Sequence, residues 1–178
     1  TNGNYAGIRV KNCSTQYDNI YKNNFDGLSY GNYAEGTNRL DPLSDDDGVE
    51  YQCNCNSHNA VDFMVQFIGT DTAGAMIRGW QGNQSTSSGN VFSQDTSNVL
   101  HFSNRGKSTI NYYYCDPCTD EEPVNIFSWK PEFFEKEISN ENNCPDHYGG
   151  GGHIGLTYQE RLVKEESFAH NFSDYNSV

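Results

Sequence analysis

Cysteines are the residues of this chain whose type and spacing most clearly suggest chemistry. There are six, at Cys13, Cys53, Cys55, Cys115, Cys118 and Cys144. On an extended strand the sulfur atoms of Cys53 and Cys55 would lie on one side, about 7 Å apart, which is too far for them to bond each other. We therefore expect at least one disulfide between this pair and Cys115-x-x-Cys118. Cys13 and Cys144 would then be left to form a third bridge. A Cys115–Cys118 disulfide is the alternative.

The same residues also suggest a zinc site, because zinc fingers combine two pairs of cysteines. His58 would add an imidazole three residues after Cys55. However, the single residue between Cys53 and Cys55 is a shorter spacing than zinc fingers use. An even number of cysteines in a polar, asparagine-rich chain favours disulfides and an oxidising compartment.

An acidic turn precedes the first cysteine pair. Its carboxylates are Asp41, Asp45, Asp46, Asp47 and Glu50. Oxygen ligands at this density suit Ca²⁺. Asp45-x-Asp47-Gly48 resembles half of an EF-hand loop, but Leu43 stands where the first ligand should be and no Glu occupies the last position. Asp45, Asp47 and Glu50 are therefore the candidate ligands of a different calcium loop, and a solvated acidic turn is the alternative.

Aromatic residues make up 13% of the chain, although its mean hydropathy is only −0.82. Trp80 and Trp129 are the candidate ligand-binding residues, since amphipathic rings can stack on sugars. Aromatic side chains are also common in cores and subunit interfaces, which is the alternative.

Evidence for catalysis is weak. The sequence has neither a Gly-x-Ser-x-Gly elbow nor a His-Glu-x-x-His motif. A secreted glycosidase would need two carboxyl groups, and Asp62, Glu132, Glu135 and Glu160 are candidates. Any acidic surface would offer as many, so we expect no enzymatic activity.

Three acceptor motifs for N-glycosylation begin at Asn12, Asn83 and Asn171. Together with the cysteines they predict a secreted or cell-surface glycoprotein. The chain starts at Thr1 without Met, which suggests a processed chain or a piece of a longer one. The net charge of −13 disfavours binding to nucleic acid and to anionic membranes, and no apolar run is long enough for a transmembrane helix.

Short β-prone segments dominate the secondary-structure prediction. In the central stretch, Val61, Phe63, Val65 and Phe67 alternate with other residues, which indicates a strand with one buried face. Two β-prone segments are joined by residues 103–107, which contain a glycine, and this pattern suggests a hairpin. Residues 131–138 form the best helix candidate, because Pro131 suits a first helical position.

No internal repeat is visible. Many short strands joined by turns predict one all-β domain over residues 1–178, with a disulfide-stapled sandwich or jelly-roll-like fold. For function we expect a structural or adhesive module that packs against copies of itself or neighbouring extracellular domains. The alternative is a Ca²⁺-assisted carbohydrate-binding domain, and a secreted glycosidase is third.

Overall fold

The computed structural model describes residues 5–70, 76–94, 99–116, 118, 120–139 and 144, and nearly all of its regular structure is β-strand. One row of strands forms a five-stranded sheet: β1 (Ala6–Lys11), β4 (Tyr30–Glu35), β7 (Val61–Gln66), β9 (Leu100–Asn104) and β11 (Ile126–Ser128). A second row comprises β2 (Tyr17–Tyr21), β5 (Gly48–Gln52), β8 (Trp80–Gln81), β10 (Ile110–Cys115) and β12 (Phe134–Ser139). A third row contains β3 (Asn24–Asp26) and β6 (Cys55–Ser57).

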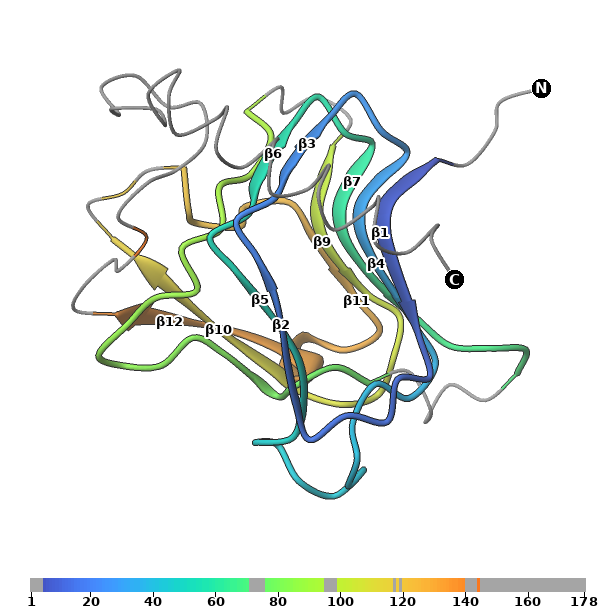
Figure 1. The fold of residues 1–178 in the computed structure, drawn as a ribbon. Helices are drawn as coiled ribbons and strands as arrows, with labels where there is room; N and C mark the ends of the chain where they lie inside the picture. The colour runs from blue at the N-terminus through green and yellow to red at the C-terminus, as the bar shows by residue number, and fades with distance from the viewer. Residues whose placement is uncertain are drawn as a thin grey trace, which may run out of the picture.

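Every strand pair in the described chain is parallel, and strands of one row follow one another only after the chain has passed through the other rows. The chain therefore winds through stacked coils as a parallel β-solenoid, which Figure 1 shows with β1, β4, β7 and β9 side by side. The second row is divided into a β2–β5 pair and a β8–β10–β12 sheet. The Gln81 amide joins these sheets, because it accepts from the Tyr51 N–H at 2.8 Å and donates to the Val49 carbonyl at 3.2 Å.

The all-β prediction agrees with this structure, but the sandwich or jelly roll does not. Those folds pack antiparallel sheets face to face, whereas these sheets are parallel. The predicted hairpin across 103–107 is also wrong. β9 pairs with β7 and β11, whereas β10 pairs with β8 and β12, so the connection between β9 and β10 turns a corner of the coil.

The coils form a structural repeat that the sequence does not show. Paired residues are 24 positions apart between β1 and β4, 31 between β4 and β7, and 39 between β7 and β9. Coils of unequal length have no fixed period. The paired residues of neighbouring coils also share little beyond the asparagine at one corner.

That corner carries a ladder of asparagine side chains from Asn23, Asn54 and Asn90. The Asn23 N–H donates to Asn54 Oδ1 at 3.1 Å, and the Asn54 N–H donates to Asn90 Oδ1 at 3.0 Å. In turn, Asn54 Nδ2 donates to the Ile20 carbonyl and Asn90 Nδ2 to the Tyr51 carbonyl, both at 2.8 Å. Asn54 and Asn90 thus satisfy backbone groups of the preceding coil at a bend, where strand pairing is interrupted.

The residue before each of these asparagines has a left-handed backbone. Its φ angle is +55° at Lys22, +56° at Cys53 and +63° at Gly89. Such angles are uncommon for residues other than glycine. Their recurrence at stacked positions indicates that the bend itself is the common requirement, and that side-chain identity there is free to vary.

Large side chains fill the interior of the coils. The Phe63 ring stacks on Phe102 with centroids 5.5 Å apart, and Tyr51 and Phe92 meet it edge-on. Phe63 and Val65 belong to this core, as predicted, and Phe67 packs against it. Asp62 and Met64, on the opposite face of β7, are buried as well, so the strand lacks the exposed face that its alternation suggested.

The predicted helix over 131–138 is largely a strand. Pro131–Phe133 forms one turn of 3-10 helix (η2), in agreement with the position of the proline. From Phe134 the chain then pairs with β10 along the whole of β12. Tertiary pairing and burial of the Phe134 ring outweigh the weak helical preference of this segment.

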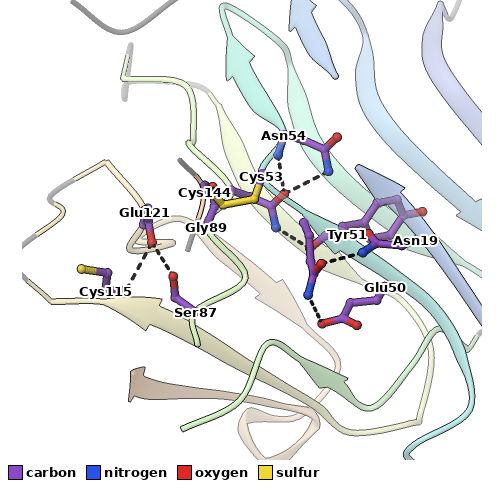
Figure 2. The surroundings of a disulfide bond; sticks show 12 residues. Asn19, Glu50, Tyr51, Cys53, Asn54, Ser87, Gly89, Cys115, Glu121 and Cys144 are labelled. Carbon is purple, nitrogen blue, oxygen red and sulfur yellow. Dashed lines mark hydrogen bonds between the residues drawn. A yellow bond between two sulfur atoms is a disulfide. The ribbon is translucent and has the colours of Figure 1, made fainter. Parts of the chain in front are cut away.

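One disulfide staples the solenoid. Cys53 is bonded to Cys144, with Cα atoms 5.5 Å apart, beside the asparagine ladder (Figure 2). This pairing replaces the predicted bridge between Cys53-x-Cys55 and Cys115-x-x-Cys118. Cys13, which we expected to pair with Cys144, keeps its thiol and donates to Asn38 Oδ1 at 3.0 Å.

Replacing Asn54 tests the ladder. We expect Asn54→Ala to lower the free energy of unfolding by about 2–4 kcal/mol, because the Asn23 N–H and the Ile20 carbonyl would lose their hydrogen bonds to the Asn54 side chain. Urea denaturation would measure the loss. The control is Asn24→Ala, an exposed position one residue from the ladder, which should change stability by less than about 0.5 kcal/mol. Equal effects of the two substitutions would contradict a special role for the ladder.

Removing the disulfide should have a larger effect. It closes a loop with a sequence separation of 91, for which the chain-entropy model gives about 4–5 kcal/mol. We expect a Cys53→Ser/Cys144→Ser double variant to lose stability on that scale, measured by urea denaturation without reductant. Cys13→Ser is the matched control and should leave stability nearly unchanged. A double variant as stable as the parent protein would contradict the predicted stabilisation by the disulfide.

Candidate functional site

A pocket of about 430 Å³ lies on the outer face of the second row of strands. Strand alternation explains which side chains reach it. In β5, Val49 and Tyr51 enter the core, so Glu50 and Gln52 face outward. In β10, Tyr112 is in the core and Tyr113 faces the pocket.

Three aromatic side chains line this pocket: Tyr17, Trp80 and Tyr113. The rings of Trp80 and Tyr113 are 6.1 Å apart and tilted by 38°. Tyr17 lies under the guanidinium of Arg78, whose central carbon is 5.1 Å from the ring centroid. More than half of the Tyr17 surface remains exposed. The site therefore offers partly exposed rings, and Arg78 covers one face of Tyr17.

A buried carboxylate forms the polar centre of the same pocket. Glu50 is 3% exposed, and Arg78 donates to its Oε2 at 2.7 Å. Its Oε1 accepts from Gln52 Nε2 at 2.9 Å and from the Gly82 N–H at 3.0 Å. Gln52 Oε1 in turn accepts from Asn19 Nδ2 at 2.5 Å, and Figure 2 labels Glu50 and Asn19 at the two ends of this chain of hydrogen bonds. The ion pair with Arg78 and the hydrogen bonds offset the cost of burying the Glu50 charge. The same contacts hold Arg78 and Gln52 in place.

The three predicted calcium ligands do not come together. Asp45 accepts from Arg39 at 3.0 Å, Asp47 Oδ2 accepts from the Asp41 N–H at 3.2 Å, and Glu50 is engaged as described. Within the described residues there is no group of three or more His, Cys, Asp or Glu that could hold a metal ion. Cys53, a proposed zinc ligand, is in the disulfide.

The two candidate tryptophans lie apart in the fold. Trp80 is in the pocket, whereas Trp129 follows β11 and is not part of the pocket lining. Trp129 is 55% exposed and donates its indole N–H to the Arg105 carbonyl at 2.7 Å. Its ring meets Phe127 at a centroid distance of 6.2 Å.

The candidate catalytic carboxyl groups are scattered. Asp62 is sealed inside the protein, where it accepts from Ser93 Oγ at 2.7 Å, the Ser93 N–H at 2.9 Å and Asn59 Nδ2 at 3.1 Å. Glu132 and Glu135 are exposed near the last described strand, and Glu160 lies outside the described residues. None of the three described carboxyl groups lines the pocket.

The glycosylation motifs also differ in position. Asn83 lines the pocket and its side chain is exposed. Asn12 follows β1, and its Oδ1 accepts from the Thr37 N–H at 3.0 Å. Asn171 lies outside the described residues.

Sequence reasoning did not link Tyr17, Glu50, Gln52, Arg78 and Tyr113 to a common site. They come from four strands or their flanks in successive coils, so only the stacking of the coils brings them together. The available signal was the alternation within each strand, which marks outward positions but does not show which coils are neighbours.

Comparison with known proteins adds no assignment: no protein-family model, curated protein or solved structure matches the chain. None of the helical structure in the described residues has the length and apolar character needed to span a membrane.

Asp62 gives a prediction for pH dependence. Burial raises the pKa of this carboxyl to about 6, against the opposing effect of its hydrogen bonds. The folded state therefore holds the proton more tightly than the unfolded state, whose pKa is about 4. The contribution of Asp62 to the free energy of unfolding is fully present below about pH 4. It is lost as the pH rises through about 6, and the loss is on the order of 3 kcal/mol.

We expect Asp62→Asn to remove that fall, as measured by urea denaturation from pH 4 to pH 7. Asp26 is a control of opposite sign, because hydrogen bonds from Ser57 and His58 lower the pKa of this exposed carboxyl. Asp26→Asn should leave the fall between pH 4 and pH 7 in place. An unchanged pH profile for Asp62→Asn would contradict the prediction.

Proposed function

We propose that this chain binds carbohydrate without enzymatic activity, in the pocket formed by Tyr17, Trp80, Tyr113, Glu50, Gln52 and Arg78, here named the aromatic site. The observation that carries the proposal is the combination of exposed rings and fixed polar groups in one pocket. Sugar rings present apolar C–H faces that can pack on aromatic rings, and hydroxyl groups that need both donors and acceptors. The aromatic site supplies all three.

The shape of the site favours a chain of sugars over a single one. Its lining comes from β2, β5, β8, β10 and their flanks, so it extends across several coils along the solenoid. Tyr17 belongs to β2, which pairs with β5, whereas Trp80 and Tyr113 belong to β8 and β10 of the adjoining sheet. Separate rings of this kind suit successive sugar units of an oligosaccharide.

The state of Glu50 supports binding and argues against hydrolysis. A retaining or inverting glycosidase needs a general acid and a second carboxylate free to reach the substrate. Glu50 is already engaged by Arg78, Gln52 and the Gly82 N–H. Its role in the proposal is to orient Arg78 and Gln52 toward hydroxyl groups. The separation of Asp45, Asp47 and Glu50 gives no support to a role for Ca²⁺, so binding should persist in chelator.

Tryptophan replacements provide the test. The full chain, produced without N-glycans, would be screened against neutral, amino and acidic oligosaccharides, and the best binder measured by calorimetry. We expect Trp80→Ala or Tyr113→Ala to weaken binding about tenfold or more, which is about 1.4 kcal/mol. Trp129→Ala, the matched control, should bind as the parent does. Absence of any binding, or equal losses at Trp80 and Trp129, would rule the proposal out.

A structural or adhesive role in an extracellular assembly is the second candidate. The observation in its favour is the number of exposed apolar side chains on and beside the last described coil, which are Val124, Phe127, Trp129 and Ile138, with the rings of Phe127 and Trp129 in contact. Exposed apolar patches often mark protein interfaces. The same two variants separate the candidates, because this role requires Trp129→Ala, and not Trp80→Ala, to reduce self-association in analytical ultracentrifugation.

A further inference from the structure

The acceptor motif Asn83-Gln84-Ser85 lies at the wall of the aromatic site. Asn83 lines the pocket together with Trp80 and Tyr113. It directly follows Gly82, whose N–H is bonded to the buried Glu50 carboxylate. The backbone that carries Asn83 is therefore anchored to the polar centre of the site, and any group attached to this side chain starts beside the aromatic rings.

A tight turn fixes the orientation of the Asn83 amide. The Asn83 N–H donates to the Thr86 carbonyl at 2.8 Å, and the Thr86 N–H donates to the Asn83 carbonyl at 3.2 Å. Asn83 Oδ1 accepts from the N–H groups of Ser85 and Thr86 at 2.9 and 3.0 Å. Because the amide is planar, holding Oδ1 against the turn directs Nδ2 away from it. The side chain is exposed, so Nδ2 is accessible for modification.

We propose that Asn83 carries an N-linked glycan that covers the aromatic site and competes there with external carbohydrate. The inference rests on the proposed function, since it identifies a regulator of that same site. The donor class is a polyprenyl diphosphate oligosaccharide. The anomeric C–O bond to the diphosphate breaks, a bond forms from the anomeric carbon to Nδ2, the amide gives up one proton, and the lipid diphosphate leaves.

A covalently attached sugar competes efficiently because its local concentration is high. A short flexible tether gives an effective concentration in the millimolar range, so even weak stacking on Trp80 and Tyr113 holds the sugar in place. The affinity for an external ligand then falls in proportion to the fraction of molecules with an open site. If the tethered sugar occupies the site about nine-tenths of the time, the apparent Kd rises about tenfold.

The Asn12-Cys13-Ser14 motif provides an internal comparison. Asn12 is also exposed, but it follows β1 and is not part of the pocket lining. Its Oδ1 accepts from the Thr37 N–H across to the neighbouring coil. A glycan at Asn12 adds similar mass and polarity without covering the aromatic rings.

The experiment compares the parent protein, Ser85→Ala and Ser14→Ala, all secreted from a eukaryotic host. Each serine replacement removes one acceptor motif and leaves the asparagine in place, and peptide mass spectrometry gives the occupancy of each site. In calorimetry with the oligosaccharide selected above, we expect Ser85→Ala to bind about tenfold more tightly than the parent. Ser14→Ala should bind as the parent does. An unmodified Asn83, or equal affinity of Ser85→Ala and the parent, overturns the inference.

A second measurement does not depend on any external ligand. Oxidation of indole rings by N-bromosuccinimide, mapped by peptide mass spectrometry, reports how accessible each tryptophan is. The Asn83 glycan should slow oxidation of Trp80 in the parent relative to Ser85→Ala, with Trp129 as the internal reference. Equal oxidation of Trp80 in the two proteins also overturns the inference. Protection of Trp80 without binding of any oligosaccharide would instead reject the proposed function, and with it the competition, while the glycan would still be shown to cover the aromatic site.

Discussion

Hydrogen bonding between neighbouring coils is the interaction on which the rest of this structure depends. Each coil leaves backbone donors and acceptors along both edges, and only the next coil can satisfy them. Parallel strands do this along the flat faces, and Asn54 and Asn90 continue it around a corner where strand pairing is interrupted. Interior aromatic residues follow the same pairing, because Phe63 and Phe102 are opposite each other in β7 and β9 and their rings stack. In such an architecture stability is close to a sum over neighbouring units.

The stacking also creates the surface on which the proposed function depends. Outward side chains of successive coils form rows, so residues distant in sequence become neighbours. Arg78 reaches Glu50 and Tyr17 in this way, and Trp80 meets Tyr113. No single coil contains the aromatic site, and the Glu50 network would lose its partners if one coil shifted register. Site and fold are therefore specified by the same contacts.

Some local structure could be predicted from the sequence, but the pairing of the coils could not. Alternation around Phe63 correctly indicated a strand, and Pro131 correctly indicated the start of a helical turn. The mistaken sandwich came from assuming that consecutive strands pair with each other. That assumption fails in this fold, because each strand pairs with a strand of the neighbouring coil. Since the coils differ in length, no common period in the sequence reveals these partners. Trp80 could be singled out as an aromatic candidate, but its neighbour Tyr113 depends on pairing between β8 and β10.

The Cys53–Cys144 bond gives the solenoid an unusual response to mechanical force. A pull applied beyond Cys144 and at the start of the chain enters the fold through the disulfide and passes directly to the second coil. The chain between the two cysteines, a separation of 91 positions, lies inside a covalent loop and carries no load. Under tension only the chain before Cys53 would unravel. Tyr17, Glu50 and Gln52 would then leave the aromatic site, whereas the residues that it takes from positions 78 to 113 would stay inside the loop. The disulfide thus acts as a mechanical bypass as well as a thermodynamic staple.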